Sequence, residues 1–366
     1  MTTETTLFDS YDLAGLRLPN RIAMAPMSRV RSNAEGLATA SMATYYAQRA
    51  TAGLIISEGI QPSLLGQSNP MTPGLHTDAQ VESWRRVTAA THANGGRIFA
   101  QIMHGGRISH PDTTGRQPVG PSAVAAREVM VFTPTGPQPA PVPRALDTSE
   151  VAPEALSYAA AASKAIEAGF DGVELHGANG YLIGQFLSHS ANQRTDRYGG
   201  SITGRIRFAV EAVEATVAAI GGDRVGIRLS PGAGIWDAVE EEVPELYSAL
   251  LAELARHNLA YVHLEATADE EILVGLRRAW PGTMIMNPSK PLGATFTDRK
   301  AADHWLELGA DVISFGRAFV ANPDLVERLR SDLPLDEADE STYYAGGDKG
   351  YLDYSAYRHP APAVMH

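Results

Sequence analysis

The sequence predicts an α/β fold in which eight parallel strands, each followed by a helix, close into a single (β/α)8 TIM barrel. Two observations favour it. Short apolar runs alternate with longer helical patterns almost from end to end, and a continuous apolar run is typical of a parallel strand buried on both faces. Eight such strand–helix units occur, which is the number that closes this barrel. The chain of 366 residues is normal for one barrel with insertions, so we expect residues 1–366 to form a single domain.

The expected elements follow this alternation in chain order. Strands are expected at Arg21–Met27, Gly53–Glu58, Arg97–Gln101, Gly172–His176, Val225–Leu229, Tyr261–Leu264, Thr283–Met286 and Val312–Phe315. Helices are expected near 40–52, 78–94, 152–168, 203–220, 243–257, 269–280 and 297–308, with a last one beginning near Pro323. For the helix near 152–168, Thr148 or Ser149 is the expected N-cap and Pro153 is expected in the first turn. Gly169, just past the end, is a typical C-terminal signal.

Two segments lie outside the alternation. Leu7–Leu18 contains the turn-like Asp12–Gly15 and is expected to form a small β-hairpin that caps the N-terminal end of the barrel. Pro118–Pro143 is rich in Pro and Gly and lies between the third strand and its helix. A long loop in this place lies on the active face of a barrel, so we expect a substrate lid. A surface loop without a role is the alternative.

Composition excludes several classes of function. There are no Cys residues, which excludes a disulfide scaffold, a Cys-ligated zinc site, an iron–sulfur cluster and thiol catalysis. The net charge of −12, with only 30 Lys and Arg residues, argues against nucleic acid and anionic membranes as partners. The N-terminus lacks the basic and apolar regions of a signal peptide, and no apolar run reaches the about 18 residues of a membrane span. We therefore expect a cytoplasmic protein.

Three polar residues lie within six positions at the end of the fourth expected strand: His176, Asn179 and Tyr181. In barrels of this kind the chemistry lies where the strands end. His and Asn can donate hydrogen bonds to a carbonyl oxygen, and Tyr can hand over a proton. Together they are suited to polarising and protonating an unsaturated carbonyl compound. A satisfied structural His and a core Tyr with a bonded hydroxyl are the alternatives for the individual residues.

Two further signals indicate a bound anion. Gly316-Arg317 follows the eighth strand and precedes a helix, where backbone N–H groups and a guanidinium can hold a phosphate. The loop Asn287–Thr297 would supply the other half of that site. Arg228 is a charge in the middle of an apolar strand and could stabilise an anion on a cofactor. Its alternative is an ion pair with a neighbouring Glu, since a buried charge is costly unless it is paired.

The sequence resembles the Old Yellow Enzyme family of FMN-dependent ene-reductases over essentially its whole length. The most specific match is His176–Phe208, HGANGYLIGQFLSHSANQRTDRYGGSITGRIRF. The other matching stretches are Leu18–Ile22, Ala25–Ser28, Gly316–Pro323 and Tyr344–Tyr354. The resemblance implies FMN held over the C-terminal end of the barrel and no metal.

The resemblance also implies a set of site residues. The residues expected to bind the cofactor are Pro26, Met27, Ser28, Gly59, Gln101, Arg228, Gly316, Arg317 and Tyr344. Among them Arg228 would lie near N1 and the C2 carbonyl of the flavin, and Tyr344 would pack at the dimethylbenzene edge. Met103 and Gln67 are the expected substrate-pocket residues. Met103 stands where several relatives have a large aromatic residue, so the pocket is expected to be roomier there.

The implied reaction has two halves. NAD(P)H, with NADPH favoured over NADH, reduces the flavin, which passes a hydride to Cβ of an activated alkene such as an enone, enal, maleimide or nitroalkene. His176 and Asn179 would bind the carbonyl or nitro oxygen, and Tyr181 would protonate Cα. Reduction of nitroesters or nitro compounds at the same site, and a flavin-binding protein without turnover, are the alternatives. The expected partners are small-molecule alkenes, and the chain is expected to be a monomer or homodimer.

Overall fold

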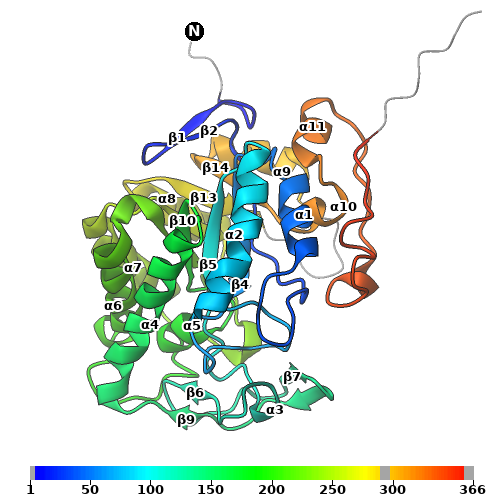
Figure 1. Ribbon diagram of the computed structural model, residues 1–366. Coiled ribbons are helices and arrows are strands. Elements are labelled where there is room, and N and C mark those ends of the chain that lie inside the picture. The colour runs from blue at the N-terminus through cyan, green and yellow to red at the C-terminus, as the bar shows by residue number, and fades with distance from the viewer. Residues whose placement is uncertain (1–4, 289–296, 358–366) are drawn as a thin grey trace, which may run out of the picture.

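Eight parallel strands close into a barrel in the computed structural model, which describes residues 5–288 and 297–357 (Figure 1). The strands are β3 (Ile22–Met24), β4 (Leu54–Ile60), β5 (Ile98–Ile102), β10 (Gly172–His176), β11 (Val225–Leu229), β12 (Tyr261–Glu265), β13 (Met284–Asn287) and β14 (Val312–Phe315). They pair in chain order, and β14 pairs with β3 to close the ring. The predicted barrel is therefore confirmed. The first strand is shorter than expected because Pro26 has no N–H with which to continue the ladder.

Helices surround the barrel and follow the strands as expected. They are α1 (Ala40–Gln48), α2 (Asp78–Ala93), α4 (Thr148–Glu167), α6 (Ile202–Ile220), α7 (Val243–Leu254), α8 (Glu270–Ala279), α9 (Arg299–Glu307), α10 (Arg317–Ala321) and α11 (Leu325–Arg330). The helix expected to begin near Pro323 is α11, and the short helix α10 lies before it in the chain. No helix in the described ranges is long and apolar enough to span a membrane.

The start of α4 differs from the prediction. Asp147 occupies the N-cap position, and its N–H donates to the Glu150 carboxylate at 2.8 Å. The prediction of Thr148 or Ser149 as the N-cap was therefore wrong, because both residues already lie within the helix. Pro153 lies inside the helix rather than in its first turn. The predicted stop is confirmed, since Gly169 follows the helix with a φ of +91°.

A short hairpin occupies the N-terminal end of the barrel. Its strands are β1 (Tyr11–Leu13) and β2 (Leu16–Leu18), joined by Ala14 and Gly15. Both turn residues have positive φ, 48° and 91°, which matches the twist of a two-residue hairpin turn. Leu13 and Leu18 are fully buried in an apolar cluster with interior barrel residues such as Phe99. The hairpin therefore closes this end of the barrel.

The segment between β5 and α4 has structure of its own. It contains the helix α3 (Pro111–Thr114), the pair β6 (Val119–Gly120) and β9 (Arg144–Ala145), and the hairpin β7 (Met130–Thr133) and β8 (Gly136–Pro139). Figure 1 places α3, β6, β7 and β9 at the end of the molecule opposite β1 and β2. Arg127 binds Asp237 of the loop after β11 at 2.6 Å. The segment expected to be a lid, residues 118–143, is thereby joined to a second loop at the same end.

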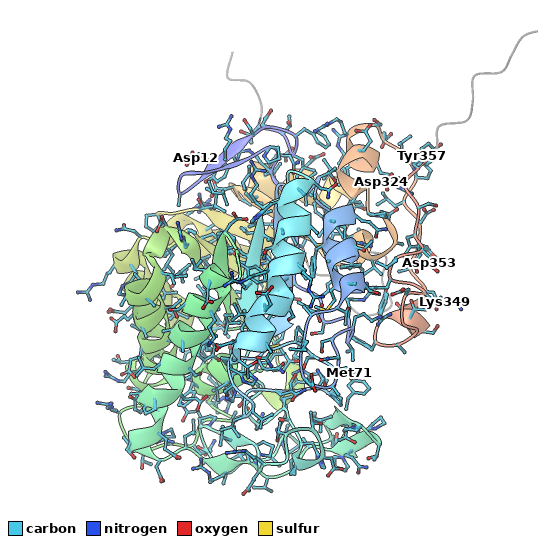
Figure 2. All side chains as sticks on the ribbon, in the orientation of Figure 1. Asp12, Met71, Asp324, Lys349, Asp353 and Tyr357 are labelled. Carbon is cyan, nitrogen blue, oxygen red and sulfur yellow. The ribbon has the colours of Figure 1, made fainter. Side chains whose placement is uncertain are left out.

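The C-terminal segment runs along the side of the barrel. Two buried residues after β3, Arg29 and Arg31, donate to carbonyl oxygens of this segment, among them Gly350 at 2.8 Å and Thr342 at 2.8 Å. Further along, the N–H of Tyr357 donates to Asp324 at 2.7 Å, and the two residues lie together in Figure 2. The segment is therefore fixed by the first and last units of the barrel.

Candidate active site

Ionisable and polar side chains from consecutive strands meet inside the C-terminal end of the barrel. Glu174 and His176 are two apart on β10, so they share one face of the strand. The parallel register places His176 beside Arg228 of β11 and Arg228 beside His263 of β12. On the other side, Glu174 lies beside Gln101 of β5. All five side chains are buried, so their protonation states depend on one another.

The hydrogen bonds of Gln101 determine which nitrogen of His176 carries the proton. The Gln101 amide donates to Glu174 at 2.8 Å and to His176 Nδ1 at 3.2 Å. Since Nδ1 accepts, the proton of the neutral ring is on Nε2. Burial, together with the charge of Arg228, lowers the pKa of His176 to about 3. At neutral pH His176 is therefore an uncharged ring with an Nε2–H that can donate to a ligand.

Arg228 is paired, as its structural alternative predicted. Its guanidinium donates to Glu265 at 3.0 Å, to Asn287 Oδ1 at 2.8 Å and to His263. Burial acts to raise the pKa of Glu265, but Arg228 and a hydrogen bond with Asn179 outweigh it and lower the pKa. Three of the five N–H groups of an arginine are thus used, and the other two have no partner among the described residues. Arg228 is therefore paired within the protein and still has N–H groups with which it could bind an anion.

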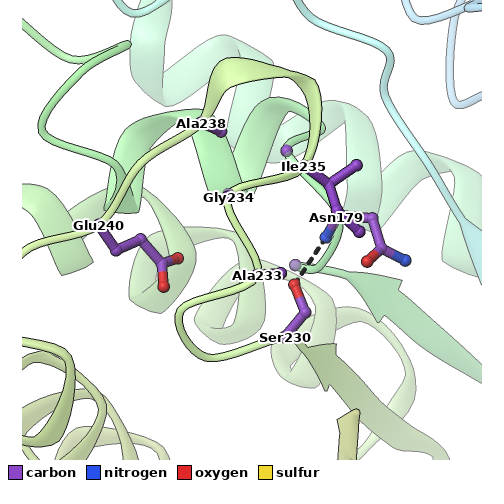
Figure 3. A pocket seen from close by; sticks show the side chains of 10 residues that line it. Asn179, Ser230, Ala233, Gly234, Ile235, Ala238 and Glu240 are labelled. Carbon is purple, nitrogen blue, oxygen red and sulfur yellow. Dashed lines mark hydrogen bonds between the residues drawn. The ribbon is translucent and has the colours of Figure 1, made fainter. Parts of the chain in front are cut away.

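Asn179 and Tyr181 continue the rim after β10. Asn179 has a φ of 55°, a conformation that Asn adopts more readily than most residues, and its N–H donates to Ser230 Oγ at 2.8 Å (Figure 3). The Tyr181 ring lies 5.2 Å from the His176 ring between centroids. The sequence-predicted trio is therefore brought together at one rim.

A small cavity of about 10 Å³ lies behind this rim, between the loops that follow β10 and β11. It has room for about one water molecule. In Figure 3 the side-chain amide of Asn179 points away from Glu240, which lines the far side of the cavity. An organic substrate therefore needs the open mouth of the barrel rather than this cavity.

The hydroxyl of Tyr181 is hydrogen-bonded to Trp236 and Ser68. Burial of the hydroxyl raises its pKa to about 12, so Tyr181 keeps its proton at neutral pH. Neither partner was predicted from the sequence. Ser68 and Trp236 lie in the loops after β4 and β11, and neither carries a local signal that would have pointed to Tyr181.

The other expected cofactor residues lie on neighbouring loops. Pro26, Met27 and Ser28 follow β3 and are half-buried. Gly316 precedes α10, and a Cβ there would lie 3.7 Å from Met27 Sδ, so the loops after β14 and β3 are neighbours. Arg317 is half-buried at the first position of α10. Of the expected second phosphate loop, residues 289–296 lie outside the described residues.

The expected pocket residues differ in what they contact. A Cβ at Gly59 would lie 2.7 Å from Met103 Sδ, so a residue with a side chain at this position would displace Met103. Gln67 donates its amide to the Asn69 carbonyl at 3.0 Å and so stabilises its own loop. It is the next residue, Ser68, that bonds Tyr181.

Tyr344 lies at the surface of the mouth. Its side chain is 56% exposed, and its ring lies 6.1 Å from that of Phe132 in β7. Arg31 donates to the carbonyls of Thr342 and Gly347, both at 2.8 Å, and so holds the backbone on each side of Tyr344. The lid and the C-terminal segment therefore meet through two aromatic rings.

This fold and this rim define an α/β-barrel enzyme rather than a structural barrel. The family model described as the NADH:flavin oxidoreductase / NADH oxidase family matches residues 6–336. The chain belongs to this family of FMN-dependent oxidoreductases.

Relatives and solved structures support the assignment over nearly the whole chain. The 12-oxophytodienoate reductase 1 of Oryza sativa subsp. japonica is 39% identical, with 95% of this chain and 92% of that protein covered. A probable flavin mononucleotide-dependent alkene reductase of Leishmania infantum is also 39% identical, with 93% and 95% covered. The structure of morphinone reductase in complex with tetrahydroNAD is 40% identical, covers 97% of this chain and 98% of its own, and superposes with a TM-score of 0.92.

The rim has the chemistry that FMN requires. Asn179 Oδ1 is buried without a hydrogen bond to any described residue, and two N–H groups of Arg228 and the Nε2–H of His176 also have no described partner. Buried polar atoms in native proteins are almost always bonded, so the unpartnered Asn179 Oδ1, on the same rim as the donors of His176 and Arg228, indicates a polar ligand. Arg228 is the only one of these that is permanently charged, which suits the electron-rich edge of a reduced flavin.

Proposed function

We propose that this protein is an FMN-dependent ene-reductase that reduces activated alkenes. The observation that carries the proposal is the pairing, at one rim, of an uncharged His176 with a protonated Tyr181, the ring centroids being 5.2 Å apart. One residue can hold an oxygen while the other delivers a proton nearby, which is the requirement for reducing a double bond conjugated to a carbonyl or nitro group.

Each rim residue has a role in this proposal. His176 Nε2–H and the Asn179 side-chain amide donate to the carbonyl or nitro oxygen, where negative charge develops. Tyr181 supplies the proton to Cα. The bonds from Trp236 and Ser68 orient the Tyr181 hydroxyl. Because Gln101 fixes the His176 tautomer, loss of that amide would weaken the same oxygen contact.

FMN, reduced by NAD(P)H, supplies the hydride that adds to Cβ of the alkene. For this chain we propose that Arg228 binds the pyrimidine edge of FMN, with Gln101 and Gly59 on the same side. Pro26, Met27 and Ser28 would line the ring and Tyr344 its far edge. Gly316 and Arg317 would hold the phosphate.

Several finer features belong to the same proposal. Met103 and Gln67 would border the substrate, the lid segment would cover it, and NADPH would be the favoured donor. We propose that the chain works as a single barrel domain. Its assembly as a monomer or homodimer stays a prediction.

The first test is a spectroscopic titration. The purified protein should show a flavin spectrum that bleaches with NADPH in the absence of oxygen and recovers when 2-cyclohexenone is added. Recovery with a nitroester but not with the enone would favour the nitro-compound alternative. Bleaching without recovery by either would favour a flavin protein without turnover, and a protein that neither contains nor takes up FMN would refute the proposal.

A further inference from the structure

A buried polar network lies one layer below the rim, and the roles proposed above assign none to its members Glu174 and His263. Glu174 and His263 have no exposed surface. One carboxylate oxygen of Glu174 accepts from Gln101 at 2.8 Å, and the other accepts from His263 Nδ1 at 2.8 Å. On its other side His263 Nε2 is bonded to Ser314 Oγ at 2.8 Å and to the guanidinium of Arg228.

The proton positions in this network follow from the bonds. A carboxylate can only accept, so His263 carries its proton on Nδ1 and offers the Nε2 lone pair to Arg228. Burial and the charge of Arg228 lower the pKa of His263, so the ring is neutral. Burial acts to raise the pKa of Glu174, but His263, Arg228 and Gln101 outweigh it and lower the pKa. Glu174 therefore remains a buried anion.

The network determines how two flavin-binding side chains are presented. Glu174 fixes the amide of Gln101, and through His263 it fixes one end of the Arg228 guanidinium. Glu265 fixes the other end at 3.0 Å. With His263 neutral, one cation is balanced by two carboxylates, Glu174 and Glu265, so the network as a whole is negative. A negative charge buried next to a flavin disfavours the anionic reduced form, because charges interact strongly in a low-dielectric interior.

We propose that Glu174 and His263 are positioning residues for FMN, and that the Glu174 carboxylate lowers the reduction potential of the bound flavin. This inference rests on the proposed function, since it requires FMN at Arg228 and Gln101. Glu174 then has two separable effects. Its charge affects the reduction potential, and the length of its side chain affects how FMN is positioned.

Two substitutions separate these effects. Glu174→Gln keeps the size and removes the charge, so reduced FMN should bind about tenfold more tightly relative to oxidised FMN, which is a rise of about 30 mV for a two-electron couple. Glu174→Asp keeps the charge and shortens the side chain, so both forms of FMN should bind more weakly while the potential stays close to that of the wild type. The measurements are FMN dissociation constants and the midpoint potential by anaerobic dye titration.

A matched control is Thr91→Val, a buried residue of α2 whose hydroxyl bonds only its own helix, at Val87 O, 2.9 Å away. Its potential should equal that of the wild type. If Glu174→Gln does not fold, Glu265→Gln decides the matter, because it removes the second carboxylate and should shift the potential in the same direction. A folded variant with the wild-type potential and FMN affinity would overturn the inference. A wild-type protein without FMN affinity would instead refute the proposed function on which it rests.

Discussion

Burial shifts the pKa values of Tyr181 and His176 in opposite directions and leaves both side chains uncharged at neutral pH. The pKa of Tyr181 rises to about 12 and that of His176 falls to about 3. In both cases desolvation is the main cause, because it disfavours whichever form is charged. Across the whole physiological pH range the Tyr181 hydroxyl therefore keeps its proton and the His176 ring stays neutral.

Replacing Tyr181 by Phe should therefore affect only one half of the reaction. We expect alkene reduction to slow by about 100-fold or more, which is the usual contribution of a general acid. Reduction of the flavin by NAD(P)H needs no proton from this hydroxyl and should be nearly unchanged. Stopped-flow measurement of the two halves separately checks this. Equal losses in both halves would remove Tyr181 from the role of proton donor.

Glu58 of β4 gives a second prediction, on stability. Its side chain is buried and accepts from the Tyr46 hydroxyl at 3.3 Å, and burial raises its pKa to about 7. The folded state therefore binds this proton more tightly than the unfolded state, so the stability from protonated Glu58 is lost as pH rises toward and through 7.

Between pH 6 and pH 8 the wild type should lose about 1 kcal/mol more of its unfolding free energy than Glu58→Gln does. Urea denaturation at the two pH values measures the difference. Glu35→Gln, at an exposed position, is the control and should follow the wild type. Equal pH dependence in Glu58→Gln and the wild type would mean that Glu58 is ionised throughout.

At the level of the elements, the hairpin of β7 and β8 contacts the C-terminal segment through the rings of Phe132 and Tyr344. Met130 and Phe132 alternate with buried residues on β7 and are 49% and 50% exposed. Only Phe132 has an aromatic partner, Tyr344. Such a pair contributes about 0.5–1.5 kcal/mol, so if the segment acts as the proposed lid, this contact can favour its closed position without fixing it there.

Phe132→Ala should accordingly raise the KM for the alkene roughly 2–10-fold, as expected for the loss of one aromatic pair, with little effect on the melting temperature. Met130→Ala removes a similar exposed side chain from the same face of the strand and serves as the control. Steady-state kinetics on both variants provide the measurement. The same rise in KM for both would indicate a general effect of hairpin surface rather than of the contact with Tyr344.

The sequence predicted most elements but not their ends. The apolar runs located all eight strands because a parallel strand buried on both faces has a strong local signal. The start of α4 was misplaced because Asp147, Thr148 and Ser149 are all good caps, and the choice depends on the bond from Asp147 to Glu150. The helix expected to begin near Pro323 is α11, whereas α10 before it is only five residues long and too short to show a helical periodicity.

At the scale of the whole molecule, the site residues that come at the end of one strand could be predicted from the sequence. The residues that only the closure of the barrel brings together could not. His176, Asn179 and Tyr181 lie within six positions of the sequence. Glu174 and His263 also break apolar strands, as Arg228 does, so the rule that identified Arg228 could have found them. Ser68 and Trp236 could not be found this way, since only the closed barrel brings their loops to Tyr181.

The two ends of the closed barrel also differ in the kind of residue that they contain. Leu13 and Leu18 of the hairpin are fully buried among apolar residues at the N-terminal end, while the polar rim lies where the strands end. Side chains at the N-terminal face of such a barrel contribute to folding and those at the C-terminal face to function. The two ends should therefore respond independently to substitution.

Leu13→Ala tests this separation, because it empties part of a buried cluster without touching the rim. We expect it to lower the free energy of unfolding by about 2–5 kcal/mol, as is usual for a buried Leu. FMN affinity, midpoint potential and the rate of alkene reduction should stay at wild-type values below the melting transition. Arg17→Ala, at an exposed position on the same hairpin, is the control and should change neither property. A loss of FMN affinity in folded Leu13→Ala would mean that strain at the N-terminal end reaches the rim through the strands, and that the hairpin helps to shape the site as well as to close the barrel.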